Sequence, residues 1–221
     1  MEFIKNYLAV RKTIPENVML IAVSKFSPFE TILTLYNETG HSLFGESRAQ
    51  ELALKQAQLP VGISWHFIGH LQTNKIKLLL AHTSLIQSVD SYRLLKEINR
   101  ESAQLDKVTD VLLQFHVATE ETKFGLSKDE TVEMIMDKEF NTLQNIKLKG
   151  VMGMASFTDD HSLVRKEFKT LRRLFEELRR DYFASDASFS EVSMGMSSDY
   201  TLAIEEGSTM VRIGSLIFGE R

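Results

Sequence analysis

Near the N-terminus, Lys25 is the residue with the clearest chemical potential, because it ends the apolar run in "LIAVSKFSP", which begins at Leu20. A buried ammonium is costly unless an opposite charge pairs with it, its stem carries it to solvent, or a reaction consumes its charge. A lysine amine that has lost its proton attacks carbonyl carbons, and partial desolvation at a strand end favours that loss. The position therefore predicts either a Schiff-base lysine or a lysine that extends to solvent.

Two later segments are rich in the small residues that an anion-binding loop requires. They read "SMGMSSDY" from Ser193 and "VRIGSLIFG" from Val211. Small residues let backbone amides approach an anion, and a following helix N-terminus adds a favourable dipole. Taken singly, the same serines and glycines also serve as ordinary caps and turns. Together with Lys25, the two segments predict a phosphorylated aldehyde held as an imine.

Strand-like segments alternate with helical patterns and would position these residues. The expected strands are apolar or alternating runs at residues 18–24, 42–45, 65–68, 85–89, 111–117, 146–152, 189–194 and 210–213. The longest helical pattern has apolar residues spaced by four, three, four, three and four, which predicts one buried stripe: Val164, Phe168, Leu171, Phe175, Leu178 and Tyr182. A similar stripe begins with Ala49, Leu52, Gln56 and Leu59.

This alternation predicts the α/β class with a parallel sheet, and eight strands favour a single (β/α)₈ TIM barrel formed by residues 1–221 as one domain. The alternative is an open doubly wound sheet. The turn after the first strand, "AVSKFSP", has no glycine, whereas a dinucleotide-binding fingerprint would have several there. In a barrel, Lys25 and the two small-residue loops would meet at the carboxyl ends of the strands, where the loops after strands seven and eight often bind phosphate.

Composition excludes several classes of protein and site. The chain has 221 residues with 43% hydrophobic and 25% charged residues, and its net charge of −4 argues against a nucleic-acid partner. It contains no cysteine, which excludes disulfides, thiolate catalysis and cysteine metal sites. His66 and His70 in "HFIGH" lack an intervening acid, so we expect no metal site. No signal peptide or membrane-length apolar window is evident, which predicts a cytoplasmic protein without a membrane partner.

A set of motifs shares its order and spacing with a known family. These are "LIAVSKFSP", "LFGES" with "QEL", "WHFIGHLQTNK", "QSVDS", "LKGVMGMA", "SMGMSSDY" and "AIEEGSTMVRIGSLIFGER". They extend from about residue 20 to the C-terminus and so cover nearly the whole chain. On these motifs the sequence resembles the pyridoxal phosphate homeostasis proteins, which are similar to the barrel domain of bacterial alanine racemase without its C-terminal β-domain.

The resemblance implies pyridoxal 5′-phosphate (PLP), a form of vitamin B6, as the cofactor. Lys25 matches the lysine that forms a Schiff base with the cofactor aldehyde. Arg212 matches the arginine at the pyridine nitrogen; a guanidinium only donates, so it would leave that nitrogen unprotonated and weaken the cofactor as an electron sink. By itself Arg212 is also compatible with a structural ion pair. The phosphate cradle corresponds to Ser197, Ser198, Gly214 and Ser215.

Several residues near these motifs stay open at this point. Polar residues of "HFIGHLQTNK" are compatible with the mouth of the pocket, with a partner-binding site or with a structural turn: His66, Gln72, Asn74 and Lys75. Three methionines near strand ends either cover the cofactor ring or fill the core: Met152, Met154 and Met196. The chain departs from common family patterns at Ser47 and His116, where many relatives have asparagine near the cofactor, and at His70, where proline is common.

The resemblance implies a carrier or buffer that binds PLP, keeps free aldehyde low and takes part in intracellular PLP homeostasis. We expect amino acids as further small ligands, PLP-dependent apo-enzymes as clients, a monomer and no robust catalytic activity. The alternative is a PLP-dependent amino-acid racemase. Alanine racemase takes its second base, a tyrosine, from the C-terminal β-domain of a partner subunit, and this chain ends at Arg221 just after "IFGE", so two-base racemisation is not expected. A cofactor-free class I aldolase is a third possibility.

Overall fold

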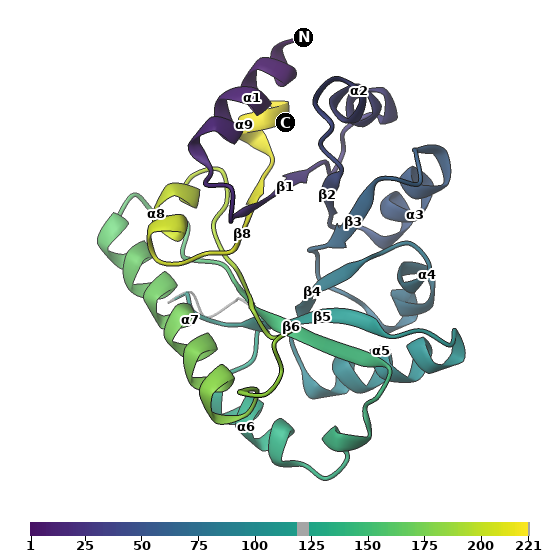
Figure 1. Cartoon of the computed structure of the whole chain (residues 1–221), viewed down its shortest axis with the longest axis vertical. Helices are drawn as coiled ribbons and strands as arrows, with labels where there is room; N and C mark the ends of the chain where they lie inside the picture. The colour runs from purple at the N-terminus through teal and green to yellow at the C-terminus, as the bar shows by residue number, and fades with distance from the viewer. Residues whose placement is uncertain (119–123, 221) are drawn as a thin grey trace.

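The computed structural model describes residues 1–118 and 124–220, and within them eight parallel strands form a closed barrel (Figure 1). Each strand pairs with the next along the chain, and β8 pairs with β1 through registers such as Ile21 with Arg212. The strands are β1 (Met19–Val23), β2 (Leu43–Glu46), β3 (Ser64–Phe67), β4 (Leu85–Val89), β5 (Thr109–Phe115), β6 (Ile146–Gly153), β7 (Glu191–Ser193) and β8 (Met210–Ile213). The closed order confirms the predicted barrel and excludes the open doubly wound sheet.

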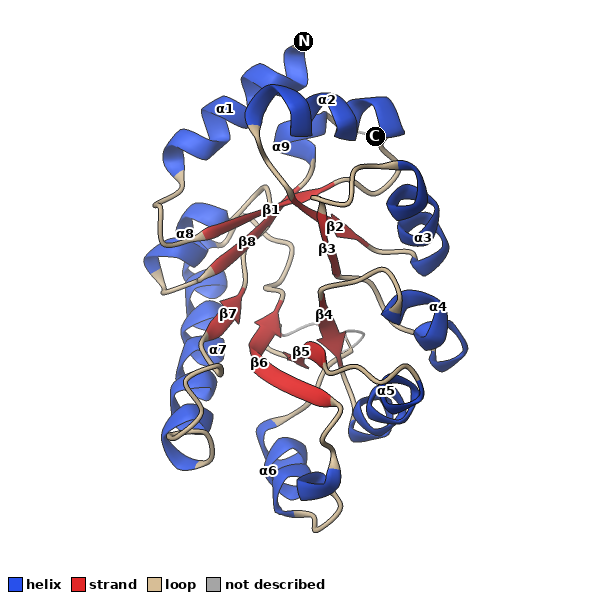
Figure 2. Cartoon of the chain, turned by 45° about the vertical axis from the view of Figure 1, so that its right-hand side comes forward, coloured by secondary structure: helices blue, strands red, loops and turns tan. Residues whose placement is uncertain are grey.

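Helices surround the barrel and connect successive strands (Figure 2). They are α1 (Glu2–Thr13), α2 (Phe29–Thr39), α3 (Ala49–Gln58), α4 (Ile76–Leu80), α5 (Tyr92–Gln104), α6 (Lys128–Met136), α7 (His161–Asp181), α8 (Tyr200–Glu205) and α9 (Ser215–Phe218), with short 3₁₀ turns η1 (Thr73–Lys75) and η2 (Phe140–Thr142). Among the described residues, no helix combines the length and the apolarity needed to cross a lipid bilayer.

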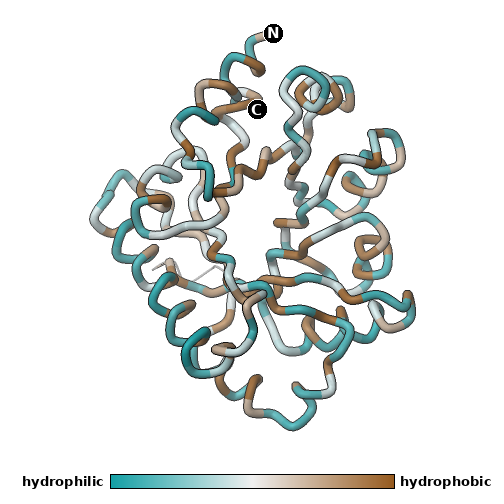
Figure 3. The backbone as a smooth tube through the Cα atoms, viewed as in Figure 1, coloured by the Kyte–Doolittle hydropathy of each residue, from teal (hydrophilic) through white to brown (hydrophobic). Residues whose placement is uncertain are grey.

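Apolar side chains fill both sides of the sheet, because successive residues of a strand point alternately into the barrel and toward the helices. The larger cluster lies between the strands and the helices, and a smaller one fills the barrel interior with Ile21, Leu85, Leu112, Met152 and Met210. Hydropathy follows the same division, with apolar segments along the strands and polar ones at the outer turns (Figure 3). The sheet is therefore a rigid support for the loops at its carboxyl edge.

Helix α7 buries the predicted apolar stripe against the barrel, except at its end. Val164, Phe168, Leu171, Phe175 and Leu178 are all buried. The spacing also predicts Tyr182 on the stripe, but this prediction is wrong: the helix ends at Asp181 and Tyr182 is exposed. The backbone of Tyr182 leaves the helical path, so the spacing of 3.6 residues per turn no longer determines its side-chain direction.

The first and last helices lie side by side next to β1 and β8 (Figures 1 and 2). The Asn6 side-chain amide donates to the carbonyl of Ile217 at 3.4 Å, which joins α1 to α9. Because α9 begins at Ser215, this contact supports the loop that follows β8.

Candidate functional site

A cavity of about 440 Å³ opens at the carboxyl ends of the strands. Its volume lies within the range of about 300–1,000 Å³ that is usual for small-molecule sites. The loops after β1, β2, β3, β6, β7 and β8 contribute to it, so the barrel brings together residues from both ends of the sequence. The lining consists of Val23, Lys25, Ser47, Ile68, Met154, Phe157, Met196, Ser197, Ser198, Arg212, Gly214, Ser215 and Gly219. All six residues predicted for the cofactor site are in this set.

Lys25 lies in a tight turn after β1, in which the backbone N–H of Ser27 donates to the carbonyl of Ser24 at 2.8 Å. Its side chain lines the cavity and is exposed. The expected partial desolvation of this lysine is therefore wrong, because the turn carries Lys25 beyond the buried end of the strand. Within the part of the chain that the structure describes, no hydrogen bond or ion pair occupies its amine, which leaves the amine accessible to a molecule in the cavity.

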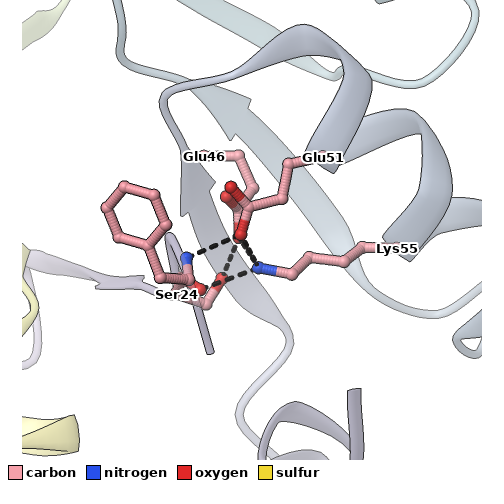
Figure 4. Close-up of polar contacts among 5 residues, drawn as sticks. Ser24, Glu46, Glu51 and Lys55 are labelled. Carbon is pink, nitrogen blue, oxygen red and sulfur yellow. Dashed lines mark hydrogen bonds and ion pairs between the residues drawn. The ribbon is translucent and has the colours of Figure 1, made fainter. Parts of the chain in front are cut away.

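A second lysine, Lys55 of α3, lies beside the same turn in a different environment (Figure 4). Its amine donates to the carbonyl of Ser24 at 2.8 Å and to one carboxylate oxygen each of Glu46 and Glu51 at 2.7 Å. The side chain is only 3% exposed. With its three N–H groups committed to acceptors, Lys55 is held as an ammonium and is not available as a nucleophile.

The sequence-based prediction missed Lys55 because it followed apolar spacing alone and placed Gln56 on the buried stripe of α3. The structure buries Ala49, Leu52 and Lys55, whereas Gln56 is only half-buried. A signal was present in the sequence: Glu51 and Lys55 are four residues apart, which places them on one face of a helix. The carboxylate of Glu46, at the end of β2, is fully buried, and this burial raises its pKa against the opposing effect of Lys55.

The loops after β7 and β8 meet at one corner of the cavity. The Ser197 hydroxyl oxygen accepts from the backbone N–H groups of Gly214 at 3.3 Å and Leu216 at 3.5 Å. These bonds are long, and a charged oxygen would be a stronger acceptor for both amides than a hydroxyl is. A Cβ added at Gly214 would lie 3.2 Å from the Val23 carbonyl oxygen, a tight contact that reflects how closely this loop approaches β1. The corner thus has the donors that a phosphate group needs.

A glycine and a carboxylate shape the loop after β7. Gly195 has a φ of +95°, and a Cβ there would lie 2.6 Å from the Cβ of Ala203. The carboxylate of Asp199 accepts from the backbone N–H of Met196 at 2.6 Å. These two features direct Ser197 and Ser198 toward the cavity.

Arg212 belongs to β8 and lies at the bottom of the cavity, where it is 4% exposed. Its guanidinium donates to the Ser193 hydroxyl at 2.5 Å and to the carbonyl of Gly153 at 3.0 Å. Burial lowers the pKa of Arg212 to about 10, against the opposing charge of Asp199, so the side chain remains a cation at neutral pH. Both hydrogen-bond partners are uncharged. A buried cation held by neutral acceptors is suited to a ligand atom that accepts a hydrogen bond.

Behind Arg212, a directional chain of hydrogen bonds continues through the barrel interior. The Ser193 hydroxyl donates to Gln87 Oε1 at 2.6 Å, and Gln87 Nε2 donates to Nδ1 of His66 at 2.9 Å. Because an arginine can only donate, it sets the direction of every following bond, and His66 must accept at Nδ1 as a neutral imidazole. Burial lowers the pKa of His66 to about 4, in agreement with this assignment.

The structure places the residues whose roles the sequence left undecided in different parts of the molecule. Ser47, Met154 and Met196 line the cavity, whereas Met152 belongs to the barrel core. His66 lies below the cavity and not at its mouth. Gln72 and Asn74 line a separate cavity with His70, Asp90 and Arg93. Lys75 and His116 are not among the described lining residues, and Lys123, an alternative lysine for an imine, lies outside the described residues.

A scan against protein families matches residues 2–221 to the N-terminal domain of alanine racemase. The pyridoxal phosphate homeostasis protein of Aquifex aeolicus is 41% identical over 204 residues, which cover 91% of this chain and 86% of that protein. The chain belongs to the pyridoxal phosphate homeostasis protein family. The resemblance inferred from the motifs is thereby confirmed.

Solved structures agree with membership in the pyridoxal phosphate homeostasis proteins. PipY of Synechococcus elongatus, solved with PLP bound, is 32% identical with a TM-score of 0.87, over 98% of this chain and 100% of that one. The same protein without PLP gives a TM-score of 0.90. Alanine racemase of Clostridium difficile has a TM-score of 0.77 over all of this chain and 57% of its own length; at 15% identity this likeness shows a shared fold alone.

Proposed function

We propose that this protein binds PLP as a Schiff base on Lys25 and serves as a carrier or buffer of the cofactor in PLP homeostasis. The observation that carries the proposal is that one cavity contains the Lys25 amine, which no described residue pairs with, a corner of backbone amides and a buried guanidinium. Membership in a family whose relatives are named for PLP homeostasis, and the PLP-bound PipY structure, support it.

The residues present fit the cofactor group by group. Ser197, Ser198, Gly214 and Ser215 would bind the phosphate, and Arg212 would donate to the pyridine nitrogen. When bound, PLP supplies an aldehyde that forms a reversible imine and a ring that withdraws electrons. Since Arg212 only donates, it keeps the ring nitrogen unprotonated and limits that withdrawal.

A role in holding and releasing the cofactor suits the cavity better than a role in racemisation. Apart from Lys25 and Arg212, the described residues that line the cavity carry no titratable side chain. Racemisation needs a second base on the opposite face of the substrate carbon, and this lining offers none. The same proposal includes residues 1–221 acting as one PLP-binding domain, as a cytoplasmic monomer whose further ligands are amino acids and apo-enzyme clients.

Borohydride reduction tests the proposal directly. The protein mixed with PLP should show a visible imine band that borohydride removes, and peptide mass spectrometry should find the reduced adduct on Lys25. Lys25→Ala should abolish the band and keep the thermal unfolding midpoint, because an exposed turn side chain contributes little packing. Lys77→Met is the matched lysine variant, because Lys77 is exposed and does not line the cavity, and it should keep an adduct on Lys25. An adduct on Lys75, Lys123 or Lys55 in the wild-type protein would overturn the assignment. The absence of a cofactor-dependent band would favour the aldolase alternative.

A further inference from the structure

Three charged residues beside the Lys25 turn form a compact group, which we call the clamp: Glu46, Glu51 and Lys55 (Figure 4). The amine of Lys55 donates to the carbonyl of Ser24 at 2.8 Å, and Glu51 Oε1 accepts from the backbone N–H of Phe26 at 2.6 Å. These two backbone groups belong to the residues on either side of Lys25. The clamp therefore holds the backbone just before and just after the reactive side chain.

The clamp is itself rigidly built. Lys55 bridges the two carboxylates at 2.7 Å each, and the Ser24 hydroxyl donates to Glu46 Oε1 at 2.6 Å. Glu46 and Lys55 are buried, whereas Glu51 is 20% exposed. A buried ion pair is often no more stabilising than apolar side chains of the same volume. A gain in folding stability therefore does not explain why charged side chains occupy this position. A role in positioning the backbone around Lys25 does explain it.

The turn needs such support because its backbone is strained. Phe26 has a φ of +63°, in the left-handed region that is unfavourable for a bulky residue. Phe26 is 54% exposed as a residue, and the Arg48 guanidinium lies 4.6 Å from its ring centroid. A residue keeps this conformation only where its surroundings enforce it. The hydrogen bond from the Phe26 N–H to Glu51 Oε1 is one such restraint on the peptide after Lys25.

We infer that the clamp fixes the direction in which the Lys25 side chain enters the cavity and so sets the rate of imine formation with PLP. This inference rests on the proposed function. In that step the neutral amine adds to the aldehyde carbon, a carbon–nitrogen bond forms, and the carbonyl oxygen leaves as water with the two amine hydrogens. Neither an oxidant nor a reductant is needed. The clamp residues do not line the cavity and are therefore positioning residues.

The test compares Glu51→Ala with Glu51→Gln. Glutamine retains an oxygen that accepts from Phe26 and Lys55, whereas alanine removes it. The rate at which the imine band appears after rapid mixing with PLP should fall by about 10- to 100-fold in Glu51→Ala, since small misplacements of reacting groups have effects of this size. Glu51→Gln should restore most of the wild-type rate. Glu177→Ala is the matched control, because Glu177 is 26% exposed and pairs with Lys128 away from the cavity; its rate should equal that of the wild type.

Pyridoxine 5′-phosphate, which lacks the aldehyde, separates positioning from general damage to the cavity. Its affinity for Glu51→Ala should match that for the wild type. Two results would overturn the role of the clamp. One is a loss of affinity for this probe in Glu51→Ala as large in fold-change as the fall in imine rate, and the other is an unchanged imine rate in that variant. If Glu51→Ala does not fold, Ser24→Ala removes the hydroxyl that donates to Glu46 Oε1 within the clamp and should slow the imine in the same direction. A wild-type protein that forms no reducible adduct would instead overturn the proposed function itself.

Discussion

Lys25 and Lys55 lie next to the same turn and have the same type of side-chain amine. Their surroundings leave the Lys25 amine able to react and the Lys55 amine unable to do so. The amine of Lys55 is committed to two carboxylates and a carbonyl, whereas Lys25 faces the cavity. Residue identity therefore does not select the nucleophile here. The arrangement of acceptors does, because an ammonium with three acceptors has neither a lone pair nor freedom to move.

At the same scale, His66 makes the stability of the fold depend on pH. Its pKa is about 4 in the folded protein and about 6.5 when unfolded, so between these values the unfolded chain binds more protons. Stability is then complete above pH 6.5 and falls as the pH drops toward 4, by about 3 kcal/mol for this residue. Denaturant unfolding of wild type and His66→Asn across this range should show a shallower loss in the variant. Identical slopes would refute the role of His66; His41, also with a pKa of about 4, contributes equally to both proteins.

At the scale of elements, the loop after β7 depends on Gly195. In Gly195→Ala, the left-handed backbone costs about 1–2 kcal/mol, and the new Cβ meets Ala203. The loop should shift, and the affinity for PLP and for inorganic phosphate should fall by about tenfold, the equivalent of about 1.4 kcal/mol. Gly40→Ala is the matched control, because Gly40 has a φ of +71° with nothing near its Cβ position. Titrations that show equal losses of affinity in the two variants would contradict the prediction.

The strands and helices that could be predicted from the sequence are those whose pattern of apolar residues follows from burial. The runs at residues 85–89 and 210–213 match β4 and β8 without error, because most of their residues are apolar and the strands are buried on both faces. The contacts of Gln87 and Lys55 were not predictable in this way. Both are polar residues in buried positions. Gln87 contacts Ser193 of β7 and His66 of β3, and Lys55 contacts the Ser24 carbonyl after β1, so each takes at least one partner from a distant segment that only the fold brings near.

For the whole molecule, the cavity predicts cofactor transfer without substantial catalysis. Alanine and other common amino acids should be racemised far more slowly than the roughly 1–10³ turnovers per second of ordinary enzymes. The PLP-loaded protein should restore the activity of a PLP-dependent apo-enzyme. Lys25→Ala incubated with the same amount of PLP and desalted in parallel is the control. Turnover in the enzymatic range would favour the racemase alternative, and a failure to transfer would leave a passive binding protein.

The pairing of β1 with β8 also has a consequence for folding kinetics. Lys25 follows the first strand, while Gly214 and Ser215 follow the last, and Gly214 approaches the Val23 carbonyl only after these strands pair. Contacts between such distant parts of a chain form late, because the entropy of closing the loop opposes them. The binding site therefore arises together with barrel closure, and a ligand that binds only this closed state shifts the folding equilibrium toward it. The time course of cofactor uptake during refolding would thus report when β1 pairs with β8 and the barrel closes.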